Sequence, residues 1–143
     1  MLNFIRVITL LSCVLCLAPL AASEADEAGV RAALNQYFRG HATGSGEEMC
    51  KAFLPTAHIE GLRNGKFVSW TAGEYCGRFK GNPAADEATR VRTIDRIDIS
   101  GTAAAATATL VHGQTTFVDY FVLLKVDDEW QIANKVYAAA PTK

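Results

Sequence analysis

Residues 118–135 read VDYFVLLKVDDEWQIANK, and this stretch decides the fold. Two apolar segments flank Asp127-Asp128, a pattern typical of a β-hairpin that turns at the two aspartates. Side chains alternate between the two faces of a strand, so a turn at this point places Lys125 opposite Trp130 and fixes which residues share a face. The predicted core face carries Phe117, Asp119, Phe121, Leu123, Trp130, Ile132 and Asn134. The other face, expected to be partly exposed, carries Val118, Tyr120, Val122, Leu124, Gln131, Ala133, Lys135 and Tyr137.

Asp119 is the unusual residue of this hairpin, because it is a carboxylate on the face predicted to be buried. A buried carboxylate is costly unless it is hydrogen-bonded or neutralised. Such groups cluster at functional sites, which makes Asp119 a candidate site residue. The structural alternative is an aspartate that accepts hydrogen bonds from backbone N–H groups or from an arginine and holds the sheet to a helix. Both interpretations stay open from the sequence.

The chain before the hairpin predicts helices. Apolar and aromatic residues from Val30 to His41 recur on one face of a helix at about 26–42. Two pairs of residues have the spacing of a capping box and predict two further short helices, namely Ser45 with Glu48 and Thr71 with Glu74.

Strands fill most of the remaining chain. Asn64-Gly65 predicts a tight β-hairpin between the two short helices. After a loop at about 80–88, glycine and aspartate turns separate four expected strands, at about 90–99, 102–112, 115–126 and 129–138. Helices first and a strand meander after them favour an α+β domain, with helices on one face of an antiparallel sheet.

The first 23 residues, MLNFIRVITLLSCVLCLAPLAAS, have the layout of a secretory signal peptide. They carry one positive charge at Arg6, an apolar run from Val7 to Leu20 and a small-residue end. We expect cleavage after residue 23, which leaves residues 24–143 as one domain exported to the periplasm or secreted. A membrane anchor is the first alternative, although a spanning helix needs about 20 apolar residues. A lipoprotein signal cleaved before Cys13 is the second alternative. The apolar run continues past that residue, which makes the match to such a signal weak.

Cys50 and Cys76 remain in the expected mature chain. In an oxidising compartment they are candidates for one disulfide, and two buried thiols are the alternative. The formal net charge is −1 and no basic stripe is present, so the sequence gives no indication of a nucleic-acid partner. It contains no phosphate-binding loop, no Ser/His/Asp order and no cysteine or histidine cluster, so we expect no cofactor and no metal.

The order of elements and several short motifs resemble a known family. The aromatic face of the first helix is followed by FLPTAHIE (53–60), the Asn64-Gly65 hairpin, TAGEYC (71–76) and VDYFVLLKVDDEWQIANKVY (118–137). Over about residues 28–138 the chain resembles the nuclear transport factor 2-like superfamily, and most closely its lumazine-binding branch. The resemblance implies a cone-shaped, cystatin-like roll, in which a curved antiparallel sheet wraps around N-terminal helices. It also implies a pocket at the open end and frequent homodimerisation.

The same superfamily includes ketosteroid isomerases and polyketide cyclases, and this sequence matches the isomerase pattern in part. The isomerases place a helix tyrosine and a strand aspartate in an oxyanion hole. The resemblance puts Tyr37 and Asp119 at these positions. The general base of the isomerases would fall on Gly61, which has no side chain, and Glu60 beside it is expected on the other face. Loss of a positioned base costs about 10²–10⁴-fold in rate, so the match is incomplete.

Three functions follow as hypotheses. The favoured one is binding of a small organic ligand in an apolar pocket without catalysis, with Tyr37, Trp70, Asp119, Phe121 and Asn134 as pocket residues. The second is an isomerase, dehydratase or cyclase that uses Asp119, or His58 with Glu60 as a base and its orienting partner. The plainer interpretation of that pair is a polar rim on an exposed hairpin. The third is a protein-interaction module with a filled pocket. We expect a homodimer through the partly exposed face of the last hairpin.

Overall fold

The computed structural model describes residues 23–142. The expected signal peptide therefore lies outside the described residues, except for Ser23. Within 23–142, no helix is both long enough and apolar enough to cross a membrane.

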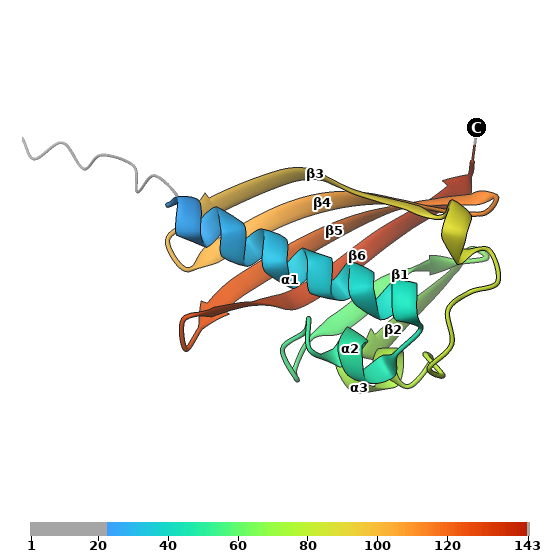
Figure 1. Cartoon of the computed structure of the whole chain (residues 1–143), viewed down its shortest axis with the longest axis horizontal. Helices are drawn as coiled ribbons and strands as arrows, with labels where there is room; N and C mark the ends of the chain where they lie inside the picture. The colour runs from blue at the N-terminus through green and yellow to red at the C-terminus, as the bar shows by residue number, and fades with distance from the viewer. Residues whose placement is uncertain (1–22, 143) are drawn as a thin grey trace, which may run out of the picture.

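The first element is helix α1, Glu24–Thr43, which runs along one face of a curved sheet (Figure 1). Its start is fixed by Ser23, whose side chain accepts a hydrogen bond from the backbone N–H of Asp26. Its end is fixed by Gly44, which adopts the left-handed conformation with φ of 63°. The helix buries a face that includes Val30, Leu34 and Tyr37. The helical periodicity of the sequence predicted this face.

Two short helices, α2 (Gly46–Cys50) and α3 (Ala72–Cys76), begin at the two predicted capping residues. Ser45 caps α2, and Thr71 forms a complete capping box with Glu74 at the start of α3. A disulfide joins Cys50 to Cys76, with a Cα–Cα distance of 5.6 Å. The bond ties the two short helices together beneath the end of α1.

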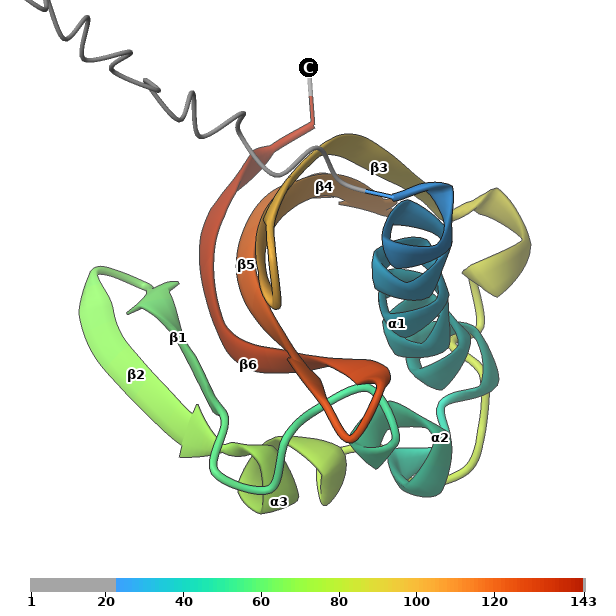
Figure 2. The same cartoon turned by 90° about the vertical axis from the view of Figure 1, so that its left-hand side faces the viewer.

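Six strands form one sheet in the order β2-β1-β6-β5-β4-β3. The strands are β1 (His58–Arg63), β2 (Lys66–Thr71), β3 (Val91–Ser100), β4 (Ala103–His112), β5 (Thr115–Val126) and β6 (Glu129–Pro141). A 3-10 turn, η1 (Glu87–Thr89), precedes β3. All pairings are antiparallel except β1 with β6, which is parallel. Figure 2 shows the sheet curling around α1, as expected for the α+β roll.

The last hairpin turns at Asp127-Asp128, with Lys125 opposite Trp130 as predicted. Both aspartates have positive φ, 50° and 66°, the geometry of a tight primed turn. Farther along β6 the prediction is wrong, because the register shifts where Val122 pairs with Asn134 and Leu123 with Ile132. Ala133 is therefore an extra residue, a β-bulge, and it reverses the facing of every later residue of β6.

The bulge corrects the predicted faces of β6. Lys135 is buried and pairs with Phe121, and Tyr137 pairs with Asp119, so both point to the concave side of the sheet. Asn134, expected on that side, instead accepts a hydrogen bond from the backbone N–H of His58 at 2.9 Å. That amide lies at the start of β1. Before this point β6 pairs with residues 52–54, and after it β6 pairs with β1.

Candidate functional site

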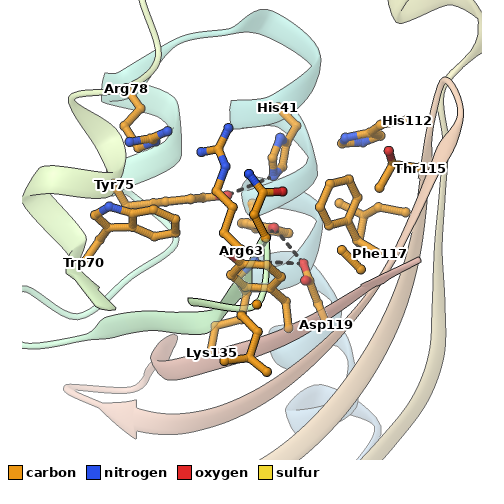
Figure 3. Close-up of a pocket in the computed structure, with 17 residues that line it drawn as sticks. His41, Arg63, Trp70, Tyr75, Arg78, His112, Thr115, Phe117, Asp119 and Lys135 are labelled. Carbon is orange, nitrogen blue, oxygen red and sulfur yellow. Dashed lines mark hydrogen bonds and ion pairs between the residues drawn. The ribbon is translucent and has the colours of Figure 1, made fainter. Parts of the chain in front are cut away.

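A cavity of about 750 Å³ opens between the concave face of the sheet, the end of α1 and the β1–β2 hairpin (Figure 3). Its size is within the range of small-molecule sites. Every layer of the fold contributes to its lining, which consists of Tyr37, His41, Leu62, Arg63, Asn64, Gly65, Trp70, Tyr75, Arg78, Leu110, His112, Thr115, Phe117, Asp119, Lys135, Tyr137 and Ala139.

A buried polar triad of Tyr37, Asp119 and Lys135 forms one wall of the cavity. The hydroxyl of Tyr37 donates to Oδ2 of Asp119 at 2.7 Å, and Nζ of Lys135 donates to the same oxygen at 3.1 Å. Nζ also donates to the hydroxyl oxygen of Tyr37 at 3.0 Å. All three side chains are at least 95% buried. Charge pairing thus replaces the hydration that burial removes from the carboxylate and the ammonium.

Three tyrosine rings surround the ammonium group of Lys135. Its Nζ lies 5.1, 5.5 and 5.2 Å from the ring centroids of Tyr37, Tyr75 and Tyr137. Aromatic faces carry partial negative charge and attract a cation at such distances. Burial, followed by the Asp119 carboxylate, raises the pKa of Tyr37 well above its ordinary value, and burial also raises the pKa of Tyr75. Both hydroxyls are therefore protonated at neutral pH.

The second oxygen of Asp119, Oδ1, is buried and has no hydrogen-bond partner within residues 23–142. A buried acceptor without a donor costs about 1–3 kcal/mol, so such atoms are rare in folded proteins. Because Asp119 lines the cavity, an N–H or O–H group of a bound molecule can supply the missing donor.

Two histidines, His41 from α1 and His112 from β4, line the cavity with their ring centroids 5.2 Å apart. Burial lowers the pKa of His41 well below its ordinary range, and the nearby Lys135 acts in the same direction. Burial also lowers the pKa of His112 to about 4, with Arg92 and Arg90 contributing. Both rings are therefore neutral at pH 7. Nε2 of His41 lies 3.4 Å from the hydroxyl of Tyr75, whereas Nε2 of His112 has no partner in the described chain.

Trp70 and Tyr137 form an aromatic wall. Their ring planes differ by 4° and their centroids are 6.5 Å apart. Gly61 lies beside this wall, and a Cβ atom at position 61 would come within 2.6 Å of the Tyr137 ring. The position that the isomerase pattern assigns to a general base therefore has no room for a side chain while Tyr137 is in place.

The structure brings together part of the predicted site. Tyr37, Trp70 and Asp119 line the cavity, whereas Phe121 lies beneath it in the core against the Tyr37 ring. The placement of Asn134 in the cavity is wrong, because the bulge at Ala133 turns its side chain toward the start of β1.

The alternative base pair, His58 and Glu60, does not line the cavity. Both flank the buried Ile59 on strand β1, so they lie on the other face of the strand. His58 is exposed, and Glu60 accepts a hydrogen bond from Ser69 at 3.1 Å. This arrangement fits the plainer interpretation of the pair as a polar rim.

Lys135, Tyr137 and His41 line the site but were not among the residues predicted for it. The facing of Lys135 and Tyr137 depends on the bulge, and no glycine or other residue in 130–137 marks it. His41 could have been found, because it lies four residues after Tyr37 on the same helix face.

Within residues 23–142, no group of three or more His, Cys, Asp or Glu side chains is placed to hold a metal ion. Tyr37 does not present its proton to the cavity, because its hydroxyl donates to Asp119. The arrangement therefore offers a ligand a carboxylate acceptor, neutral imidazoles, an aromatic wall and two rim arginines, Arg63 and Arg78.

Comparison with known proteins places the chain in a family. Residues 25–138 match the family described as "Putative lumazine-binding". An NTF2-like protein of unknown function from Methylobacillus flagellatus KT is 32% identical, with a TM-score of 0.75 over 85% of this chain and 98% of that one. An NTF2-like protein of unknown function from Shewanella baltica OS155 is 26% identical, with a TM-score of 0.74 over 85% of this chain and all of that one.

A more distant structure shares the fold alone. A domain of unknown function with a cystatin-like fold from Nostoc punctiforme PCC 73102 is 19% identical, with a TM-score of 0.64 over 82% of this chain and 78% of that one. No curated protein matches the chain. The chain belongs to the family described as "Putative lumazine-binding", within the nuclear transport factor 2-like superfamily.

Proposed function

We propose that the protein binds a small planar organic molecule in the cavity of about 750 Å³ and does not turn it over. The observation that carries the proposal is Oδ1 of Asp119, a buried acceptor that lacks a donor, on a residue that lines a cavity large enough for a ligand. A ring N–H or hydroxyl group of the ligand satisfies this oxygen. The Trp70–Tyr137 wall contributes stacking area.

Binding is favoured over isomerisation because the two groups that isomerisation needs are already committed. The proton of the Tyr37 hydroxyl is donated to Asp119, and the place of the base is taken by the ring of Tyr137 beside Gly61. The cavity likewise supports ligand binding over a packed interior that serves only protein contacts.

The test is thermal unfolding of residues 22–143 with a panel of pterins including lumazine, flavins, steroids and aromatic ketones. A ligand at about 100 times its Kd adds about 2.7 kcal/mol to the free energy of unfolding. The shift should be lost in Asp119→Asn and kept in the control Asp95→Asn, whose exposed carboxylate lies on β3. Binding should also quench tryptophan fluorescence in the native protein and not in Trp70→Phe. Shifts that persist in Asp119→Asn would contradict the proposal.

We also propose that two copies associate through the convex face of the sheet. Apolar side chains from neighbouring strands are exposed there, including Tyr120 at 51%, Val122 at 51%, Leu124 at 41% and Val136 at 45%. Sedimentation velocity at micromolar concentration should give a dimer, and Val122→Glu should give a monomer. Leu62→Glu, on the β1–β2 hairpin, is the matched control and should remain dimeric. A native monomer at this concentration would exclude the proposal.

We further propose that the domain acts outside the cytoplasm. The Cys50–Cys76 disulfide supports this, because such bonds persist in oxidising compartments. Fractionation of cells that express the full chain, with N-terminal sequencing of the product, tests it. An uncleaved product in the cytoplasmic fraction would contradict it.

A further inference from the structure

We propose that Arg63 and Arg78 form an anion-binding subsite at the mouth of the cavity, so that the ligand is a planar aromatic molecule with an acidic group at one end. The inference rests on the proposed function and narrows the ligand class to aromatic carboxylates or phosphates.

Arg63 is placed at the cavity by strand alternation. On β1, Ile59 is fully buried and Gly61 faces Tyr137, so Arg63 follows them on the concave face. It is the last residue of β1, before the turn at Asn64-Gly65. Its backbone is therefore held by the hairpin while its long side chain reaches over the cavity (Figure 3).

Arg78 is placed by the turn that follows α3. Its backbone N–H donates to the carbonyl oxygen of Tyr75 at 3.1 Å. Its guanidinium carbon lies 4.8 Å from the centroid of the Trp70 ring. This cation–π contact holds the group at the aromatic wall. Its N–H donors form no ion pair in residues 23–142 and are available to an anion.

The charges at the cavity are not balanced. Three cationic side chains line it, Arg63, Arg78 and Lys135, against the single carboxylate of Asp119. Lys135 already pairs with that carboxylate. Neither Arg63 nor Arg78 forms an ion pair within residues 23–142, unlike the arginines near η1, where Arg90 pairs with Asp86 and Arg92 with Glu87.

This surplus of positive charge is local to the cavity, because the whole chain has a formal net charge of −1. The two cavity histidines add no charge at neutral pH. An anion that enters the cavity therefore meets two uncompensated guanidinium groups, which recognise carboxylate and phosphate by paired N–H donors.

The two ends of the cavity bind different groups of one ligand, an acidic group at the arginines and a hydrogen-bond donor at Asp119. Figure 3 shows the guanidinium groups of Arg63 and Arg78 in the upper part of the view and the Asp119 and Lys135 side chains in the lower part. A ligand that meets both has a hydrogen-bond donor for Oδ1 of Asp119 at one end and an acidic group at the other. Its ring lies between them, against Trp70 and Tyr137.

Matched probes test this ligand class by isothermal titration calorimetry on residues 22–143. The carboxylate arm compares 6-hydroxy-2-naphthoate with 6-hydroxy-2-naphthamide, and the phosphate arm compares 6-hydroxy-2-naphthyl phosphate with 2,6-dihydroxynaphthalene. In the arm that represents the ligand, the acid should bind about tenfold or more tightly than its neutral partner at low salt. The ratio should shrink in about 1 M salt, where screening is strong.

Substitutions locate the effect. The double variant Arg63→Gln/Arg78→Gln should bind the acid no more tightly than the neutral probe, so that the ratio of the two affinities falls to about 1. Arg39→Gln is the matched control, because Arg39 is exposed on α1, does not line the cavity and forms no ion pair in the described part of the chain. It should keep the native ratio.

The outcomes separate this inference from the proposed function. Equal binding of acid and neutral probes in both arms would overturn the anion subsite and leave ligand binding standing. An equal loss in Arg39→Gln and in the double variant would also overturn it, because the effect would then be one of overall charge. If no probe of either kind binds while a compound of the thermal-unfolding panel does, the inference fails and the proposed function stands; if nothing binds in either experiment, both fail.

Discussion

The carboxylate of Asp119 can be buried because Lys135 and Tyr37 share one of its oxygens. Two charges taken out of water lose hydration free energy. Their mutual attraction compensates for this loss only while both members of the pair are present. Lys135 depends on Asp119 in the same way, because no other acidic side chain pairs with it in residues 23–142. At the residue scale, the triad is thus the polar end of the candidate site, and loss of either charged member should destabilise the fold.

Removal of both charges should therefore cost less than the sum of the two single removals. We expect Asp119→Asn to lower the free energy of unfolding by about 3 kcal/mol, because it leaves the ammonium group buried without a counter-charge. Lys135→Met should cost a similar amount. The double variant should lose less than the sum of the two single losses, as measured by urea unfolding in a double-mutant cycle.

The control is the surface pair Arg96–Asp98, whose side chains are 74% and 66% exposed. Asp98→Asn should change stability by less than about 1 kcal/mol. Additive losses in the buried cycle would mean that Asp119 and Lys135 are not coupled.

At the same scale, the sequence predicted that Asp119 points inward but did not predict that Lys135 points toward it. Strand alternation counted from the Asp127-Asp128 turn predicted that Asp119 faces inward, because β5 has no irregularity between the turn and that residue. The same count failed for Asn134 and Lys135 on β6. There an extra residue intervenes, and the local sequence does not mark it.

At the scale of elements, the disulfide joins α2 and α3, two helices of five residues each. It provides stabilisation that the packing of such short helices cannot. Helices this short are unstable on their own. The bond closes a loop with a sequence separation of 26, and in the chain-entropy model a loop of this length adds about 3.5 kcal/mol. We expect Cys50→Ala/Cys76→Ala to lose about that amount in urea unfolding under oxidising conditions.

The control for the disulfide is a reductant. The native protein in dithiothreitol should match the stability of the double alanine variant, and the variant itself should not respond to the reductant. A native protein that is indifferent to reduction would contradict the expected contribution.

The start of α1 bears on the proposed cleavage of a leader peptide after residue 23. Ser23 is the N-cap, and cleavage after it would remove this residue and leave a new α-amino group on Glu24. A cation at a helix N-terminus opposes the helix dipole. We expect a chain that begins at Ala22 to be more stable by about 1 kcal/mol than one that begins at Glu24, as measured by urea unfolding. Equal stabilities would show that the cap contributes nothing.

At the scale of the whole molecule, acid should weaken the fold in two stages. The unfolded chain takes up protons on His41 and His112 at a higher pH than the folded protein, because burial lowers both pKa values. Stability therefore falls as the pH drops from about 6.5 to about 4. We expect His112 to contribute about 1–2 kcal/mol of this loss, since its partly buried ring keeps some hydration.

The second stage lies at lower pH and comes from carboxylates. Hydrogen bonds, first from Ser23 and then from Lys125, lower the pKa of Asp26 to about 2, so its contribution disappears as the pH approaches that value. Urea unfolding measured from pH 7 to pH 2 tests both stages. His112→Gln should show a smaller loss between pH 6.5 and 4, and an unchanged loss would contradict the assignment.

The architecture of the whole molecule was predictable because its signals are local and agree with one another. Ser45 and Thr71 cap helices where predicted, and the Asn64-Gly65 and Asp127-Asp128 turns lie where the strands were expected to reverse. The cavity was less predictable. It is formed by residues distant in sequence, and its polar wall depends on one interruption of alternation in β6.

That interruption, the bulge at Ala133, is the point of this sheet where a change in chain length can be accommodated. Before Ala133, the inward residues of β6 build the core, and after it they build the cavity. Loss of the codon for Ala133 would remove the bulge and leave Asn134, Lys135 and Tyr137 opposite Val122, Phe121 and Asp119, so Lys135 and Tyr137 would keep their places on the concave side. Within such a fold, the bulge is a point where a one-residue deletion can be accommodated in one evolutionary step while the binding site and the strand order are kept.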